Sequence, residues 1–146
     1  MAAKTEIDNA KRMGNCVLFA ENNISKNWMA YRKDVRFQKD QLWIGQTANG
    51  SNWICQELKD IGDTPRLENN PQLVATETDL FLFWLDSDDD RLRATKRAAS
   101  GTENTAFRWY EYVNCNTKTG AKISYDTDKE DAILSAVLLG NQILVS

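Results

Sequence analysis

An Asn-Gly pair at positions 49 and 50 is the sequence feature that most restricts how this chain can fold. It stands between two β-prone runs, residues 42–47 and 53–58. Both central positions of a tight two-residue turn need positive φ, which Asn and Gly adopt at low cost. The pair therefore predicts a β-hairpin with a two-residue turn, in which Leu42 faces Glu57.

Further strands are expected on both sides of this hairpin. Residues 28–38 alternate in part, and residues 80–85 form a continuous apolar and aromatic run that is typical of a strand buried on both faces. Residues 91–98 fit either a capped helix or a strand, and the strand is slightly favoured. Residues 107–115 and 121–126 predict one more hairpin.

Helices are expected near both ends of the chain. Residues 4–13 predict a short helix that ends at Gly14, and a capping box at Thr127 predicts a helix that ends at Gly140. A chain of 146 residues without linkers or repeats is the size of a single domain, here residues 1–146. The expected fold class is α+β: an antiparallel β-meander sheet or partial barrel, flanked by a short N-terminal helix and a C-terminal helix.

The composition excludes several kinds of chemistry. The chain has no histidine, which removes Ser-His-Asp and Cys-His catalysis and histidine-ligated zinc. Its three cysteines, Cys16, Cys55 and Cys115, form no C-x-x-C pair and are expected to be buried free thiols. No glycine-rich phosphate loop is present, and no cofactor is expected.

The charge pattern and the apolar runs bear on partners and location. The net charge of −3 hides alternating blocks: residues 26–39 carry five positive charges and one negative, and residues 77–90 carry six negatives. Such blocks favour internal pairing over a one-sided nucleic-acid surface. No apolar run is long enough for a transmembrane helix, and charged residues reach Arg12, so we expect a cytoplasmic protein without a membrane partner.

One set of residues suggests an enzyme. The predicted hairpin register places Asp40, Glu57 and Lys59 on one face of the sheet. An acid facing acid-x-Lys resembles the core of the PD-(D/E)xK nucleases, although the preceding proline is absent. The resemblance implies two carboxylates that hold Mg²⁺ and a lysine that assists the attacking water. Cross-strand ion pairing explains the same residues and is favoured.

A second acidic set suggests a cation site. Asp86, Asp88 and Asp90 alternate like the first half of a calcium loop. Arg91 stands where that loop needs glycine, and Arg97 stands where it needs a bidentate acid. An acidic turn or helix cap is therefore favoured, and no metal is predicted.

Aromatic and basic residues interleave in two segments, and the chain ends on an apolar tail. The candidate contact residues are Trp28, Tyr31, Arg32, Arg36, Phe37, Trp109, Tyr112, Ile143, Leu144 and Val145. Core packing explains the aromatic residues as well and is favoured, and the tail either packs on its own domain, which is favoured, or adds to a neighbour's sheet edge.

The leading hypothesis is a non-enzymatic subunit for protein interaction or assembly, such as a homo-oligomer or a virion component. The alternatives are a divalent-metal nuclease and a module that binds single-stranded nucleic acid by stacking.

Overall fold

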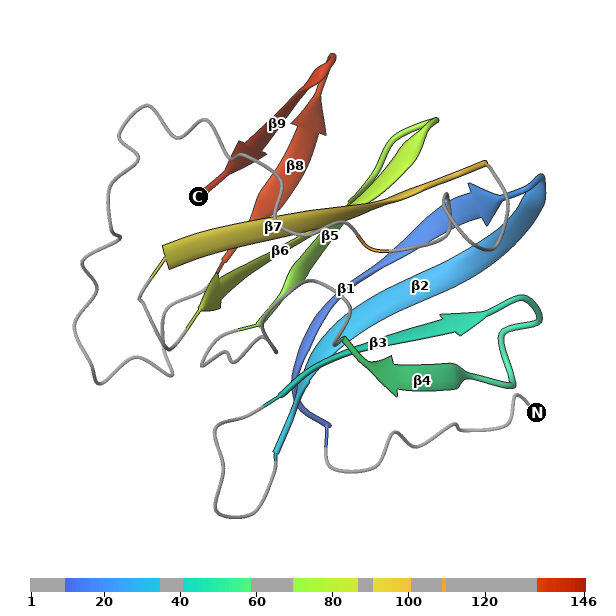
Figure 1. Ribbon diagram of the computed structural model, residues 1–146, viewed down its shortest axis with the longest axis horizontal. Coiled ribbons are helices and arrows are strands. Elements are labelled where there is room, and N and C mark those ends of the chain that lie inside the picture. The colour runs from blue at the N-terminus through green and yellow to red at the C-terminus, as the bar shows by residue number, and fades with distance from the viewer. Residues whose placement is uncertain (1–9, 35–40, 59–69, 87–90, 101–108, 110–133) are drawn as a thin grey trace.

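The computed structural model describes residues 10–34, 41–58, 70–86, 91–100, 109 and 134–146, which contain antiparallel β-sheets and no helix (Figure 1). None of these residues therefore belongs to a helix that could cross a membrane. The first sheet has the order β1 (Ala10–Glu21), β2 (Ile24–Lys33), β3 (Gln41–Thr47) and β4 (Ile54–Glu57). The second has the order β5 (Gln72–Ala75), β6 (Asp79–Asp86) and β7 (Arg91–Ala98), and β8 (Ala136–Leu139) and β9 (Gln142–Val145) form a C-terminal hairpin.

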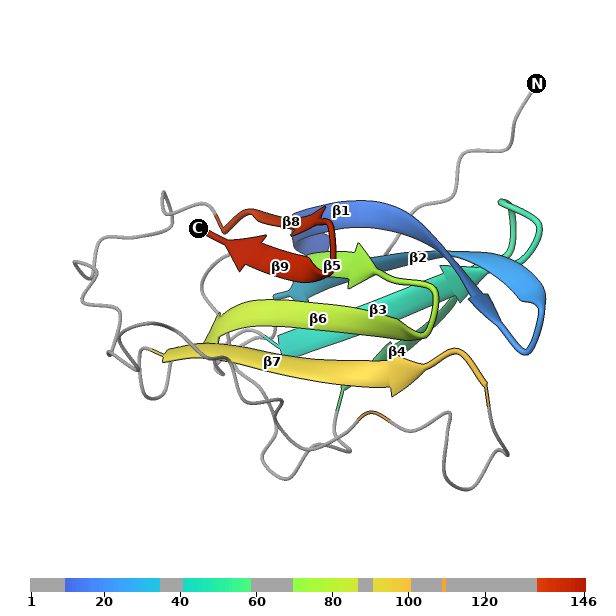
Figure 2. The same ribbon diagram turned by 90° about the horizontal axis from the view of Figure 1, so that it is seen from above.

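The two sheets pack through a shared hydrophobic core (Figure 2). Side chains alternate along a strand, so every second residue of β2, β3 and β6 points into this core. The buried cluster contains Phe19, Trp28, Ala30, Leu42, Ile44 and Leu58 from the first sheet and its flanks, Leu73, Leu80, Leu82 and Trp84 from the second sheet, and Trp109.

The other face of the second sheet carries a smaller core. Val74, Phe83, Leu85 and Ala94 form a buried cluster with Leu134. Ala136, Ile143 and Val145 of the C-terminal hairpin pack against that cluster. The second sheet is therefore covered by the first sheet on one face and, in part, by the hairpin on the other.

Strand β1 joins the two sheets. The Asn15 side chain donates to the carbonyl of Leu73 in β5 and accepts from the Leu73 N–H, both at 2.7 Å. Gly14 lies so close to β5 that a Cβ atom would stand 2.2 Å from the carbonyl oxygen of Pro71. Glycine is needed here because only a residue without a side chain permits this approach.

The strand predicted over residues 28–38 is confirmed as far as Lys33, within β2; Asp34 is not in a strand, and residues 35–38 lie outside the described residues. The strands predicted at residues 80–85 and 91–98 are confirmed as β6 and β7. Strand β6 is buried on both faces along most of its length, as its continuous apolar sequence indicates. The hairpin predicted from residues 107–115 and 121–126 lies outside the described residues, except for the buried Trp109.

The expected α+β class is wrong, because the described part of the chain is all-β. Residues 10–13, predicted to end the N-terminal helix, open β1 and pair with β2, and Gly14 lies inside that strand. Residues 4–9 lie outside the described residues. Short helices are marginal without tertiary support, and here pairing with β2 overrides the local helix signal.

The prediction of a C-terminal helix is also wrong, because strand pairing again overrides the local helix signal. Residues 136–139 form β8, and Gly140, with a φ of 62°, opens a two-residue turn into β9. Positive φ at the first central residue is typical of a type II′ hairpin turn. The apolar tail, expected to follow a helix, instead supplies the strand that pairs with β8. The capping box at Thr127 lies outside the described residues.

The Asn49-Gly50 hairpin exists, but its turn and register differ from the prediction. Six residues, 48–53, separate β3 from β4, and Glu57 faces Trp43 rather than Leu42. The Asn49 side-chain oxygen accepts the N–H groups of Ser51 and Asn52, both at 2.9 Å. This side-chain capping stabilises a longer loop than the dipeptide alone predicts.

Candidate functional site

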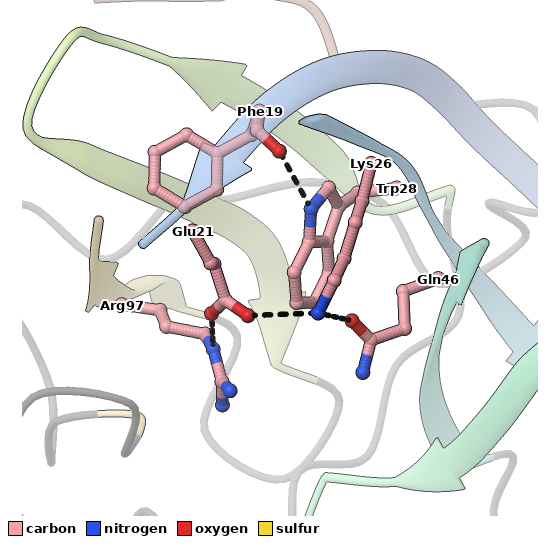
Figure 3. A network of polar contacts seen from close by, with 6 residues as sticks. All are labelled: Phe19, Glu21, Lys26, Trp28, Gln46 and Arg97. Atoms are coloured by element: carbon pink, nitrogen blue, oxygen red, sulfur yellow. Dashed lines mark hydrogen bonds and ion pairs between the residues drawn. The ribbon is translucent and has the colours of Figure 1, made fainter. Parts of the chain in front are cut away.

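A network of charged side chains, with Glu21 buried and Lys26 and Arg97 half-buried, lies between the two sheets at the β1–β2 turn (Figure 3). The Glu21 side chain is only 6% exposed, and each of its carboxylate oxygens has a cationic partner. Lys26 Nζ lies 3.3 Å from one oxygen, and Arg97 Nε of β7 donates to the other. Lys26 also donates to Gln46 of β3 at 3.0 Å. Side chains of β1, β2 and β7 therefore meet at this carboxylate, and Lys26 links it to β3.

The Trp28 ring lies beside both cations of this network. Its ring centre lies 5.9 Å from Lys26 Nζ and 5.5 Å from the Arg97 guanidinium carbon, distances at which a cation is attracted to an aromatic face. Its indole Nε1 donates to the Phe19 carbonyl at 3.3 Å. Because both Glu21 oxygens are held by cations, the arrangement suits a structural clamp between the sheets rather than a general base.

A second aromatic group lies on the outer face of the first sheet. Tyr31 and Trp43 lie with ring centres 6.4 Å apart, and Lys33 Nζ stands 3.9 Å from the Trp43 ring centre. Burial, and then a hydrogen bond with Cys55, raises the pKa of the Tyr31 hydroxyl. The Tyr31 ring is therefore already enclosed by its neighbours, and the Trp43 face is already occupied by a cation.

All four of the described aromatic and basic residues expected at an interface are inside the folded chain. Trp28, Tyr31, Arg32 and Trp109 are all buried. Arg36, Phe37 and Tyr112 lie outside the described residues. Because β2 is buried on both faces along its centre, these side chains contact other parts of the same chain.

The nuclease-like residues are placed only in part. Glu57 is half-buried in β4 and shares its face of the sheet with Trp43. A shift of one residue exchanges the two faces of a strand, so the register that grouped Glu57 with Asp40 is not the one observed. Asp40 and Lys59 lie outside the described residues, and their role stays a prediction.

The acidic and sulfur-containing candidates do not come together in the part of the chain that the structure describes. Asp86 is buried at the end of β6, where it accepts a 3.4 Å hydrogen bond from Trp84, while Asp88 and Asp90 lie outside the described residues. No group of three potential metal ligands is found among the described side chains. Cys16 and Cys55 are free thiols, but Cys16 is exposed and Cys55 is half-buried rather than buried; Cys115 lies outside the described residues.

The C-terminal hairpin carries the most exposed apolar surface among these candidates. Val137, Leu139 and Leu144 share its outer face and are 57%, 62% and 49% exposed. Of the predicted tail residues, Ile143 and Val145 point instead toward the second sheet and are half-buried. The whole segment 134–146 contains no charged side chain.

The hairpin is fastened to the second sheet rather than free in solution. The Asn70 side chain donates to the Leu134 carbonyl at 3.1 Å and accepts from the Leu134 N–H at 3.4 Å. Strand β8 lies beside β5, and Figure 1 shows the hairpin extending beyond the second sheet. The apolar outer face is therefore held in a fixed position.

Sequence reasoning identified the tail but missed Val137 and Leu139, because it assigned them to a helix. The signal that could have found them is Gly140-Asn141 between two short apolar runs, which is the same kind of hairpin signal as Asn49-Gly50. The charged network had no local signal, since Glu21 and Arg97 are far apart in the sequence.

No protein-family model, curated protein or solved structure matches this chain. Its function therefore has to be inferred from its own side chains.

Proposed function

We propose that this chain is a non-enzymatic assembly subunit that contacts other protein subunits through the outer face of the β8–β9 hairpin. The observation that carries the proposal is the row of exposed apolar side chains at Val137, Leu139 and Leu144 on a segment without charge. Continuous exposed apolar surface of this kind is typical of protein interaction sites.

The anchoring of the hairpin supports this role. A two-stranded hairpin is marginally stable alone, but here its inner face packs on the second sheet and Asn70 holds its base. A surface that is already ordered loses less conformational entropy when it binds.

The two alternative functions have less support. Single-stranded nucleic acid needs exposed aromatic rings beside cations, whereas Trp28, Tyr31 and Trp109 are buried. The nuclease hypothesis depends on Asp40 and Lys59 lying beside Glu57, and the observed register removes the reason for grouping them. The site of action stays a prediction: the cytoplasm, or a virion in which the chain is a structural component.

Charge placed on the hairpin tests the proposal. We expect light scattering coupled to size-exclusion chromatography to show an oligomer for the wild-type chain. The double substitution Val137→Lys with Leu139→Lys should convert it to a monomer, because both side chains are more than half exposed on the outer face.

Leu18→Lys and Ile54→Lys are the matched controls, since these side chains are 64% and 67% exposed but lie on other strands. They should leave the oligomer intact. A wild-type chain that stays monomeric at high concentration, or controls that dissociate the oligomer equally, would contradict the proposal.

A further inference from the structure

The hydrogen bonds at the base of the hairpin determine which backbone groups of β9 bond to β8. Ser135 and Ser146 exchange both N–H···O bonds at 2.8 Å. Bonded and non-bonded pairs alternate along an antiparallel ladder, so every second residue of β9 points its backbone groups toward β8. The observed register then makes Val137–Leu144 and Leu139–Gln142 the next bonded pairs.

The remaining residues of β9 face the opposite way. The N–H and C=O groups of Ile143 and Val145 point away from β8, toward the outer edge of the hairpin. No described strand pairs with that edge, and β8 rather than β9 lies beside β5. Natural proteins usually protect an edge strand with charges or proline, and β9 has neither.

We propose that a second copy of this chain pairs its β9 with this β9 across a two-fold axis at Leu144, which creates a continuous four-stranded ribbon. This inference rests on the proposed function: it names a second copy as the partner and adds an edge contact through β9 to the contact made by the outer face. In this register Ile143 of each copy pairs with Val145 of the other. The two pairs exchange four hydrogen bonds and use the outward backbone groups of both residues.

The composition of β9 favours a second copy as the partner. In a two-fold antiparallel pair the residue at the axis meets its own copy, and every other residue meets a residue of the same strand on the far side of the axis. A strand with charges of one sign would therefore place like charges together. Residues 134–146 have no charged side chain, which removes that repulsion. Leu144 of each copy would stand at the axis as a non-bonded pair, the closest kind of cross-strand contact.

A cysteine placed at the axis tests this geometry. Under mild oxidation, the Leu144→Cys variant should form a disulfide-linked dimer well above the level of the parent chain, since the two cysteines face each other directly. Gln142→Cys is the matched control because it is exposed on the same face but lies opposite Ser146 across the axis. Disulfide-linked dimer of this control should stay near the amount seen with the parent chain, and that amount is the background from the exposed native thiol of Cys16.

A backbone variant gives an independent readout. Val145→Pro removes the N–H that points to the outer edge but no hydrogen bond to β8, so it should weaken dimer association roughly tenfold or more. A melting curve recorded beside that of the parent distinguishes loss of association from loss of folding, and we expect the variant chain to remain folded.

The outcomes separate this inference from the proposed function. If the oligomer forms and the hairpin lysines dissociate it, but Leu144→Cys crosslinks no better than Gln142→Cys, the proposed function stands and the two-fold pairing is overturned. If the wild-type chain is a monomer at high concentration, both fail. Preferential crosslinking at position 144, together with weakened association of Val145→Pro, supports the pairing.

Discussion

The β1–β2 end of the sandwich gathers Glu21, Lys26 and Arg97 from both sheets around one buried carboxylate, whereas the C-terminal hairpin has no charged side chain. The charged end joins elements that are distant in sequence through directional contacts. The hairpin is held by apolar packing on one face and by Asn70 at its base, and its other face is open among the described residues.

This difference predicts that global unfolding of the two sheets and local opening of the hairpin have separate free energies. Changes within the sandwich should affect unfolding of the whole sheet pair, because both sheets share one core. Changes at the base of the hairpin should open only the hairpin, since local segments with few buried contacts exchange independently.

The largest effect is expected when the charged network is broken. Glu21→Gln keeps the shape of the side chain but leaves Lys26 and Arg97 without their shared counter-charge. We expect the free energy of unfolding to fall by about 3 kcal/mol, because removing the charge of a buried partner from an ion pair is strongly destabilising. Urea denaturation followed by tryptophan fluorescence measures this change.

Glu77→Gln provides the control, since Glu77 is exposed between β5 and β6. Its effect should stay within about 0.5 kcal/mol. Equal effects for the two variants would show that the network does not clamp the sheets.

A smaller loss is expected where β1 meets β5. Gly14→Ala would place a methyl group 2.2 Å from the Pro71 carbonyl oxygen, and backbone on both sides has to move. We expect a loss of about 2 kcal/mol in the free energy of unfolding, measured by the same denaturation experiment.

Gly45→Ala is the matched comparison within the first sheet. Its new methyl group would meet the side chains of Cys55 and Met29 at 3.0 and 3.2 Å, and a flexible thioether adapts more easily than backbone. Gly45→Ala should therefore lower the free energy of unfolding by less than Gly14→Ala does. A larger loss for Gly45→Ala would argue against close packing of β1 on β5.

The smallest effect is expected at the base of the hairpin. Asn70→Ala removes two side-chain hydrogen bonds to Leu134, which should lower the free energy of local opening by about 1 kcal/mol. Hydrogen exchange should then become severalfold faster for the hairpin-bonded amides of β8 and β9 and stay unchanged in β2 and β6. Faster exchange throughout the chain would show that hairpin and sandwich unfold as one unit.

The strands were predictable where the sequence carried a strong local pattern. The continuous apolar run of β6 and the alternation in β2 are such patterns, and both strands are observed. The helix prediction at residues 136–139 failed because short apolar runs fit either structure, and the pairing partner, β9, decides between them.

Only part of the candidate surface could be predicted from the sequence. Leu144 belongs to a tail whose apolar character is plain from the sequence, so it was singled out as a contact candidate, and the structure places its side chain on the exposed outer face of the hairpin. Which face of the tail is open could not be read locally, because it depends on Ile143 and Val145 packing against the second sheet.

The sequence alone determined that this chain lacks histidine chemistry, that its central segments are β-strands and that its C-terminal tail is apolar and uncharged. Only the tertiary structure decided that residues 10–13 and 136–139 are in strands rather than helices, that Glu57 faces Trp43 and that Glu21 meets Arg97. The physical reason is that composition and short periodic patterns act locally, whereas strand pairing, register and buried ion pairs join residues that are far apart along the chain.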